Sequence, residues 1–441
     1  MNNTLEPEQS RLGFLFDGDP NTPHIVAQLS NEGGKILLRL PWLEAGDPHH
    51  ARWFDSLFNS SNGLLPDTLD FYDIDGPVAL VGCHSIGATS NLTIGLGRIS
   101  IDHAVLGARR ASKYQTIHGL RSEVEGLGTW MRLRSLKQEW QVDSTGRTKT
   151  IDLHLESPAP VRVAQALNLT VRPAYRFGPG DRPDEQIITE RMLIETLSKK
   201  SRSWEDHFDL HFSLRDLLRV SSWRQLNFLK HEATRDDDPI RTMDGKSHGR
   251  QWHKLETSLV TTEPSTPRKG AVQYLFTFDD IRGRGVGRWI KLRRDMSRGI
   301  APIVAILNLK SATIETHISQ LGIGLEALGF SIAKGYGAST REAGQERFEL
   351  RLRRILNDCA SPILFDRDDW VTEMTQAYNA VKHANRTLPS PLELIRAYRK
   401  GIMVFRIWIA NQLGVGPEIL KFNLNLDPIS QWLAQNGTQS D

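Results

Sequence analysis

The chain has 441 residues, of which 39% are hydrophobic and 24% charged, with a formal net charge of +3. This length suffices for two or three hydrophobic cores. Two cysteines, Cys83 and Cys359, exclude a disulfide framework. The opening MNNTLEPEQS lacks a basic-then-apolar leader, and no run approaches the roughly 18 apolar residues of a membrane-spanning helix. We therefore expect a cytoplasmic protein with no membrane partner.

The charge is distributed unevenly between the two parts of the chain. Residues 283–441 contain 21 Lys and Arg against 15 Asp and Glu, whereas the preceding residues contain 34 against 37. A basic C-terminal part would attract a polyanion such as RNA. Because an excess of this size often arises by chance, charge alone does not identify a partner.

The N-terminal residues, 1–156, have the pattern of a β-rich domain. Short segments rich in Val, Ile and Leu are separated by Gly, Asn, Asp and Pro, which predicts strands at 24–30, 35–43, 77–83 and 92–106. Glycines inside the last of these segments predict a bend or bulge. Alternation on both sides of Ser144, Thr145 and Gly146 predicts a hairpin over 140–156.

Residues 157–282 form a mixed α/β continuation of this region. Residues 161–177 are strand-like, whereas 212–229 have helical spacing, with one buried face formed by Phe212, Leu214, Leu217, Leu218 and Val220. His207 and His211 lie four residues apart but lack the Glu of a zinc protease helix, so we interpret them as an ordinary helix or strand surface. The glycine-rich segment 281–288 predicts a linker, and we place a domain boundary there.

Residues 283–441 are predicted to be all-helical. The expected helices cover 286–297, 346–358 and 368–384, and two longer ones cover 311–333 and 391–414. Ser311 is the expected N-cap of one long helix, and a glycine stop ends the other. The four that follow 286–297 are the main helices, and four suffice for a small bundle. The predicted fold class is α+β multidomain, with a β-rich N-terminal region followed by an all-α bundle.

The most informative segment is MTQAYNAVKHANR, residues 374–386. On a helix, Asn379 and His383 lie four residues apart and share a face. Such a polar pair is costly to bury unless it is satisfied, so it would line a cleft or a dimer seam. Histidine suits proton transfer near neutral pH, and asparagine can hold the imidazole or contact a phosphate oxygen. No cluster has metal-ligand spacing, so we expect neither a metal nor a cofactor.

This segment resembles the motif of HEPN domains, an Arg followed after four to six residues by a His, often with a polar residue directly after the Arg. Tyr378, Asn379 and His383 fall on the Arg, polar and His positions. HISQLGIGLEALGF resembles the first long HEPN helix, with its acidic residue at Glu326, and ERFELRLRRIL and FDRDDW follow in the family's order. Upstream, VEGLGTWMRLRSL and FSLRDLLRVSSW resemble the N-terminal region of ApeA-like anti-phage defence proteins. The resemblance covers nearly the whole chain.

The resemblance implies a bacterial anti-phage effector with a metal-independent HEPN endoribonuclease, in which the ribose 2′-OH attacks the adjacent phosphorus. It implies that His383 acts in proton transfer and that the motif Arg stabilises the phosphate. Since Tyr378 occupies the Arg position, Lys382 or Arg386 would supply the missing cation and bind RNA, with tRNA as a candidate substrate.

Two other hypotheses remain open. One is a catalytically degenerate HEPN sensor or scaffold that dimerises and binds a ligand or RNA without cleaving it. The other treats His383 as a satisfied interface histidine. We expect a homodimer or higher oligomer through the HEPN part, because the apolar segments 311–333 and 402–414 offer more apolar surface than a four-helix monomer needs. A phage-derived trigger would act on the N-terminal region.

Overall fold

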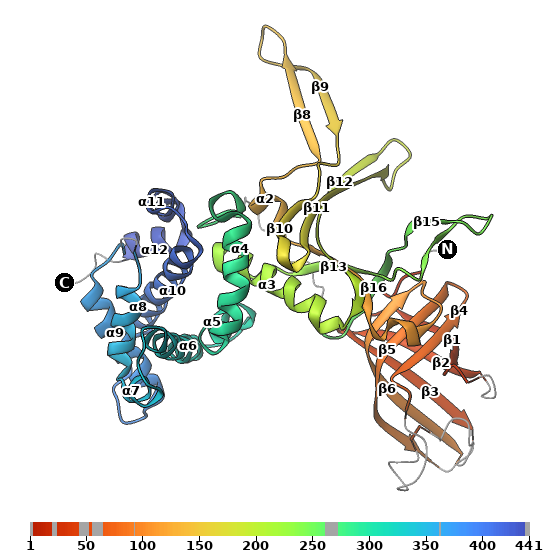
Figure 1. Cartoon of the computed structure of the whole chain (residues 1–441), viewed down its shortest axis with the longest axis horizontal. Helices are drawn as coiled ribbons and strands as arrows, with labels where there is room; N and C mark the ends of the chain where they lie inside the picture. The colour runs from red at the N-terminus through yellow and green to blue at the C-terminus, as the bar shows by residue number, and fades with distance from the viewer. Residues whose placement is uncertain are drawn as a thin grey trace. The chain divides into compact units, whose positions relative to one another are not determined.

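The computed structural model describes residues 3–19, 24–43, 53–54, 65–91, 93–260, 272–360 and 363–436. The chain divides into two compact units, shown in Figure 1. Unit 1 comprises Met1–Glu125, Leu193–His211 and Asn227–Pro264, and unit 2 comprises Gly126–Met192, Phe212–Leu226 and Ser265–Asp441. The predicted fold class is confirmed, because a β-rich N-terminal region precedes a C-terminal helical region.

The strands of unit 1 are antiparallel. They are β1 (Ser10–Phe16), β2 (Ile25–Glu32), β3 (Lys35–Leu43), β4 (Thr68–Asp73), β5 (Gly76–Ser90), β6 (Ile94–Leu106), β7 (Ile117–Val124), β13 (Phe228–Thr234), β14 (Pro239–Arg241), β15 (Ser247–Arg250) and β16 (His253–Thr257). The sheet order is β7-β13-β16-β6-β3-β2-β1-β4-β5, and β5 pairs again with β6. Strands β1 to β6 therefore close on themselves. Strand β12 (Gln186–Arg202) and helix α3 (Trp204–Ser222) contribute residues to both units.

The expected strands 24–30, 35–43 and 77–83 fall within β2, β3 and β5, and the described part of 92–106 contains β6. Buried and exposed residues alternate along β1 and β3, which is the pattern of a strand with one face on a core. The sequence predicts a bend or bulge in 92–106, and the bulge is not in β6. It lies in β5, between Ser85 and Gly87.

The glycines of β6 have a different cause. A Cβ atom at Gly95 would overlap the Trp42 ring, and one at Gly97 would overlap the Phe54 ring. These glycines therefore make room for two stacked aromatic rings, whose centroids lie 5.7 Å apart.

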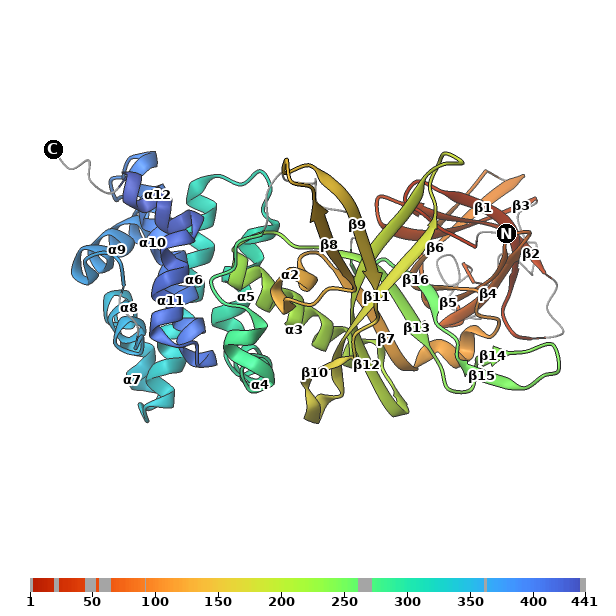
Figure 2. The same ribbon diagram turned by 90° about the horizontal axis from the view of Figure 1, so that it is seen from above.

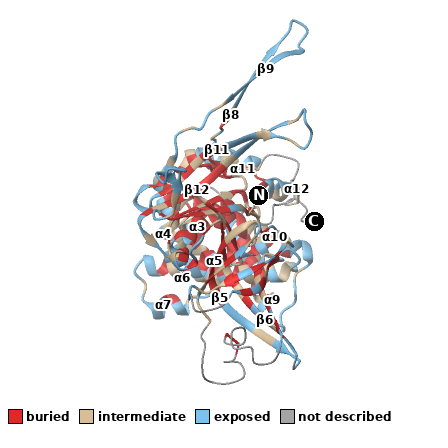
Figure 3. Ribbon diagram, turned by 90° about the vertical axis from the view of Figure 1, so that its right-hand side faces the viewer, coloured by how far each residue is buried: buried red, intermediate tan, exposed pale blue. Residues whose placement is uncertain are grey.

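The remaining β elements of unit 2 include the predicted hairpin. They are β8 (Leu136–Val142), β9 (Thr148–Leu155), β10 (Val161–Ala164) and β11 (Leu169–Pro179). In the turn between β8 and β9, the Asp143 carboxylate accepts hydrogen bonds from the backbone N–H groups of Thr145 and Arg147, and Gly146 has a left-handed φ of 81°. Figure 3 shows this hairpin exposed over most of its length.

Helices form the rest of unit 2. They are α2 (Leu127–Met131), α4 (Phe278–Asp295), α5 (Ser297–Ala305), α6 (Ile314–Gly335), α7 (Thr340–Gln345), α8 (Phe348–Asn357), α9 (Arg367–Lys382), α10 (Pro391–Leu413), α11 (Pro417–Leu426) and α12 (Pro428–Asn436). Helix α10 packs against α4, α6, α8, α9 and α12 (Figure 2). None of the helices in the described part of the chain is long and apolar enough to cross a membrane.

The bounds of these helices follow local capping signals. Helix α10 begins with Ser390 and Glu393 in a capping box and ends at Gly414, whose φ is 87°. The predicted N-cap Ser311 is wrong, because Thr313 precedes the first residue of α6. The predicted linker 281–288 is also wrong, since it lies within α4. A Thr277–Asp280 capping box starts α4, and a kink at Arg282 (φ 53°) accommodates the glycine-rich segment.

The apolar segment 402–414 fills the core of unit 2. Residues 402–410 are buried, including Arg406, whose side chain is 1% exposed. The Arg406 guanidinium donates to the Val220 and Ser221 carbonyls at 2.9 and 2.7 Å and pairs with Asp427 at 2.7 Å. One of the two apolar segments from which we expected a dimer, 402–414, is thus largely buried within one chain.

Candidate functional site

Helix α9 positions the residues that the sequence motif singles out. The Asp366 carboxylate caps its first turn by accepting from the N–H groups of Asp368 and Asp369. The helix ends at Lys382, two residues earlier than predicted, and His383 is its C-cap with φ −126° and ψ 109°. The His383 N–H donates to the Asn379 carbonyl at 2.9 Å. The two residues are therefore one turn apart, with His383 exposed at the end of the helix.

A groove of about 460 Å³ lies beside this helix end. Asn379 and Arg386 both line it, although they come from α9 and from the turn after it. Its lining consists of Thr375, Gln376, Asn379, Ala380, Arg386, Thr387, Leu388, Pro389, Ser390 and Glu393. The turn is held by a hydrogen bond from the Arg386 N–H to the His383 carbonyl at 3.0 Å. The groove thus brings two of the predicted site residues, Asn379 and Arg386, together, whereas His383 is not among its lining residues.

Several polar side chains of this groove are not bonded to other protein groups. Within the described ranges, the side chains of Gln376, Asn379, Arg386 and Thr387 make no hydrogen bond or ion pair with the protein, and the buried Thr375 hydroxyl also lacks a partner there. Gln376, Arg386 and Thr387 are exposed and bond to solvent, whereas Asn379 and Thr375 are half-buried, where polar groups are normally hydrogen-bonded. This groove is therefore suited to a polar ligand.

Tyr378 points away from the groove and into the helical bundle. Its side chain is only 5% exposed, and its hydroxyl donates to Glu326 at 3.2 Å. The centroid of its ring lies 4.7 Å from the centroid of the Phe348 ring. Its ring occupies the space that a Cβ at Gly322 would need. Burial, followed by the neighbouring Glu326 carboxylate, raises the pKa of Tyr378 to about 12. The residue at the motif Arg position is therefore a neutral phenol within the bundle.

Two cations lie near Tyr378. The Lys382 ammonium lies 5.4 Å from the centre of the Tyr378 ring, a cation–π geometry. Arg351 pairs with Glu326 at 2.9 Å and donates to the Ala343 and Gly344 carbonyls. The structure thus separates the five predicted residues. Asn379 and Arg386 line the groove, and His383 lies at the C-terminal end of α9. Tyr378 and Lys382 lie together on another face of the helix.

Sequence reasoning missed Gln376 and Thr375 as groove residues and Arg351 as the partner of Glu326. Gln376 and Asn379 are three residues apart, so their common face could have been anticipated from helical spacing. Arg351 could not, because residues 326 and 351 lie on different helices, α6 and α8.

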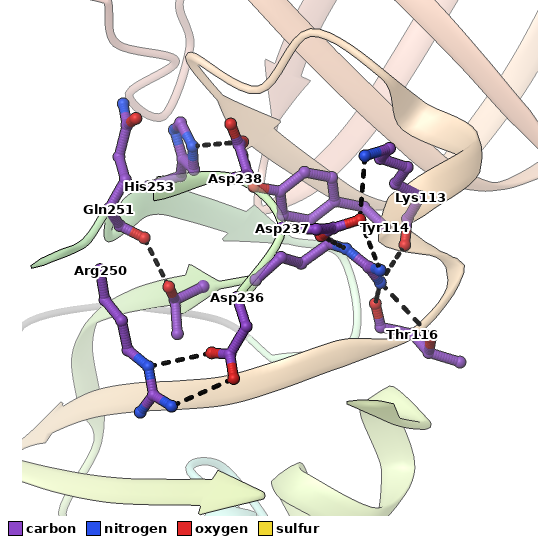
Figure 4. Close-up of polar contacts among 11 residues, drawn as sticks. Lys113, Tyr114, Thr116, Asp236, Asp237, Asp238, Arg250, Gln251 and His253 are labelled. Carbon is purple, nitrogen blue, oxygen red and sulfur yellow. Dashed lines mark hydrogen bonds and ion pairs between the residues drawn. The ribbon is translucent and has the colours of Figure 1, made fainter. Parts of the chain in front are cut away.

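Unit 1 contains a second concentration of charged groups, around Asp236, Asp237 and Asp238 (Figure 4). Asp237 pairs with Arg235 at 2.8 Å and with Lys113 at 2.9 Å. Asp238 accepts from Tyr114 at 2.8 Å and pairs with His253 at 3.0 Å, and the His253 hydrogen bond is the main cause of its lowered pKa. Asp236 pairs with Arg250 at 3.0 Å. Because each carboxylate is already paired, we interpret this cluster as structural.

The histidines of α3 are also structural. His207 and His211 are buried rather than on a surface, and both contact the Thr196 hydroxyl, at 2.7 and 3.0 Å. His211 reaches the Ser122 hydroxyl at 2.7 Å through its other nitrogen. Their four-residue spacing, which resembles that of metal ligands, therefore places both imidazoles in a chain of buried hydrogen bonds. Among the described residues, no three His, Cys, Asp or Glu side chains converge as a metal site.

A β-rich region followed by a helical bundle, with an Asn and a His at the end of one bundle helix, is the organisation of a two-part HEPN protein. Family models agree: ApeA N-terminal domain 1 matches residues 68–289, and the Apea-like HEPN domain matches residues 332–418. The chain belongs to the ApeA-like family. This membership indicates anti-phage defence and a HEPN domain of the nuclease type. No curated protein and no solved structure matches the chain.

Proposed function

We propose that the protein is a cytoplasmic bacterial anti-phage effector whose HEPN domain cleaves host or phage RNA without a metal ion, with tRNA as a candidate substrate. The observation that carries this proposal is the groove beside α9, where Asn379 and Arg386 offer donors without a protein partner among the described residues, on the helix that ends at the exposed His383. RNA supplies the phosphates and the polar base edges that such donors bind.

In the proposed reaction, the ribose 2′-oxygen forms a bond to the adjacent phosphorus while the bond from phosphorus to the 5′-oxygen breaks. The products are a 2′,3′-cyclic phosphate and a free 5′-hydroxyl. The 2′-OH loses a proton and the leaving 5′-oxygen gains one, and His383 is the group that transfers a proton in this step. Asn379 positions the imidazole or a phosphate oxygen.

Arg386 takes the cationic role that the motif Arg plays in the family. Hydrogen bonds from a guanidinium to phosphate are roughly twice as strong as neutral ones. Tyr378 is unsuited to this role, since its hydroxyl is already bonded to Glu326. Lys382, which is exposed, adds a second positive charge near the end of α9.

We also propose that two chains associate through the HEPN part, so that two copies of His383 share one composite cleft. One imidazole would then accept the 2′-OH proton and the other would donate to the leaving oxygen. The β-rich region would bind a phage-derived trigger and release the nuclease. Light scattering that gives a monomer at micromolar concentration would count against the shared cleft.

The function is tested by incubating the purified full chain with total tRNA in EDTA and analysing the RNA on a denaturing gel. Wild type should produce discrete fragments ending in cyclic phosphate, and His383→Ala should not. His154→Ala, which changes an exposed histidine on the β8–β9 hairpin, is the matched control and should cleave like wild type. Activity that disappears in EDTA would contradict the metal-independent mechanism.

The alternative, a degenerate HEPN sensor or scaffold, is favoured by one observation. The residue at the motif Arg position is bonded inside the bundle to Glu326 rather than free to meet a phosphate. This alternative predicts that wild type and His383→Ala bind RNA equally and that neither cleaves it.

A further inference from the structure

The amides of Gln376 and Asn379 form a neutral recognition face inside the groove. They are three residues apart on α9, so they lie on the same side of the helix, and both line the groove. Neither amide has a hydrogen-bond partner within the described ranges. Each amide presents one acceptor and two donor hydrogens, which complements the edge of a nucleobase.

The rest of the groove suits the faces and the phosphate of a nucleotide. Ala380, Leu388 and Pro389 supply apolar walls, and Leu388 is 48% exposed. Arg386 supplies a cation for the attached phosphate. The groove's carboxylate, Glu393, already accepts the Ser390 N–H in the capping box of α10.

We propose that this groove holds a single unstacked base of single-stranded RNA, and that Gln376 determines which base is accepted. The inference rests on the proposed nuclease function and adds a residue that determines its base specificity. An amide can read the edge of a base only where the strand is unpaired, because the major groove of an RNA duplex is too deep and narrow for side chains and its shallow minor groove is recognised mostly by shape. The substrate is therefore a loop, bulge or single strand rather than a helix.

Other ligand classes fit the lining less well. A purely apolar ligand would leave the half-buried Asn379 amide and the buried Thr375 hydroxyl without a partner, which is costly. A free polyphosphate would meet one cation, Arg386, and would face Glu393.

The test uses full-length protein and short unstructured RNAs that differ in one base. Cleavage sites are mapped for wild type, Gln376→Ala, Gln376→Glu and the control Asn385→Ala, an exposed amide outside the groove. Affinity for the same RNAs is measured with His383→Ala, alone and combined with each change. We expect wild type to prefer one base at a fixed position, and Gln376→Ala to weaken that preference about tenfold, the effect of one lost hydrogen bond.

Gln376→Glu keeps the side-chain size but removes the donor, so the preferred base should change or the binding should fall. Asn385→Ala should retain the wild-type pattern. If wild type cleaves and Gln376→Ala keeps the full base preference, the inference is overturned while the nuclease function stands. If the protein binds RNA with a base preference that Gln376→Ala removes, but never cleaves, the inference stands and the nuclease function fails. If no RNA binds, both are wrong.

Discussion

The hydroxyl of Tyr378 donates a hydrogen bond to the Glu326 carboxylate at 3.2 Å, which joins the motif helix α9 to α6. Glu326 also pairs with Arg351 of α8 at 2.9 Å. Three helices of the HEPN part thus meet at one carboxylate. The residue at the motif Arg position acts in packing, and its substitution should affect stability before catalysis.

Tyr378→Phe should therefore leave RNA cleavage unchanged and lower the free energy of unfolding by about 1 kcal/mol, the net value of one hydrogen bond. Tyr378→Arg should lower the melting temperature more, because it buries a second guanidinium beside the Arg351–Glu326 pair. Cleavage assays and thermal unfolding check both variants. Faster cleavage by Tyr378→Arg would mean that this position does reach the phosphate.

His383→Ala should reduce the cleavage rate by about 10²–10⁴-fold, because alanine transfers no proton. His383 is exposed at the C-cap of α9, so the melting temperature should remain that of wild type. Asn379→Ala should cost less activity, since only orientation is lost. Single-turnover cleavage and plaque assays measure the effect. If His383→Ala protected cells against phage as fully as wild type, the catalytic role of His383 would be wrong.

Arg386→Ala should weaken RNA binding more than Lys382→Ala does. Arg386 lines the groove without a protein partner among the described residues, whereas the Lys382 ammonium lies over the Tyr378 ring. Loss of one phosphate contact should reduce the slope of log K against log salt by about 0.7 for single-stranded RNA. Titrations at several salt concentrations measure this slope. Equal slopes for wild type and Arg386→Ala would exclude a phosphate contact.

Asp427→Ala should strongly destabilise unit 2. The Arg406 and Asp427 side chains are 1% and 2% exposed, so the change leaves a buried guanidinium uncompensated, at a cost of about 3–5 kcal/mol. Asp295→Ala removes an exposed pair with Arg294 and should cost less than about 1 kcal/mol. Urea denaturation of both variants compares the two. Similar midpoints would show that the buried pair adds little.

Stability should fall on acidification because of two buried histidines of unit 1. Burial lowers the pKa of His103 to about 3 and that of His207 to about 4. An unfolded histidine titrates near pH 6.5. The unfolded chain therefore binds more protons below that pH, and stability declines from about pH 6.5 down to these folded values.

Each such histidine changes the free energy of unfolding by at most about 1.4 kcal/mol per pH unit. His103 stacks on Trp204 with ring centres 4.2 Å apart, so His103→Phe keeps an aromatic ring and removes one titrating group. Urea denaturation between pH 7.5 and pH 5 should show a shallower pH dependence for this variant. His154→Gln, an exposed change, should leave the dependence as in wild type.

The sequence by itself determined the elements whose limits depend on local chemistry. Ser390, Pro391 and Gly414 bound α10 where predicted, because capping and left-handed closure involve only neighbouring residues. A short segment rich in Ile and Leu located β3, and the Asn379–His383 spacing with the flanking helices indicated the family. Such patterns report the backbone within a few residues.

Only the tertiary structure determined which groups the side chains contact. Adjacent residues on α9 diverge: Tyr378 enters the bundle to meet Glu326, 52 positions away in sequence, whereas Asn379 faces the groove. Capping and packing made a helix of the glycine-rich segment 281–288, and two aromatic rings explain Gly95 and Gly97. Periodicity defines a face of a helix or strand, but what that face contacts is set by packing between segments distant in sequence, which no local pattern records.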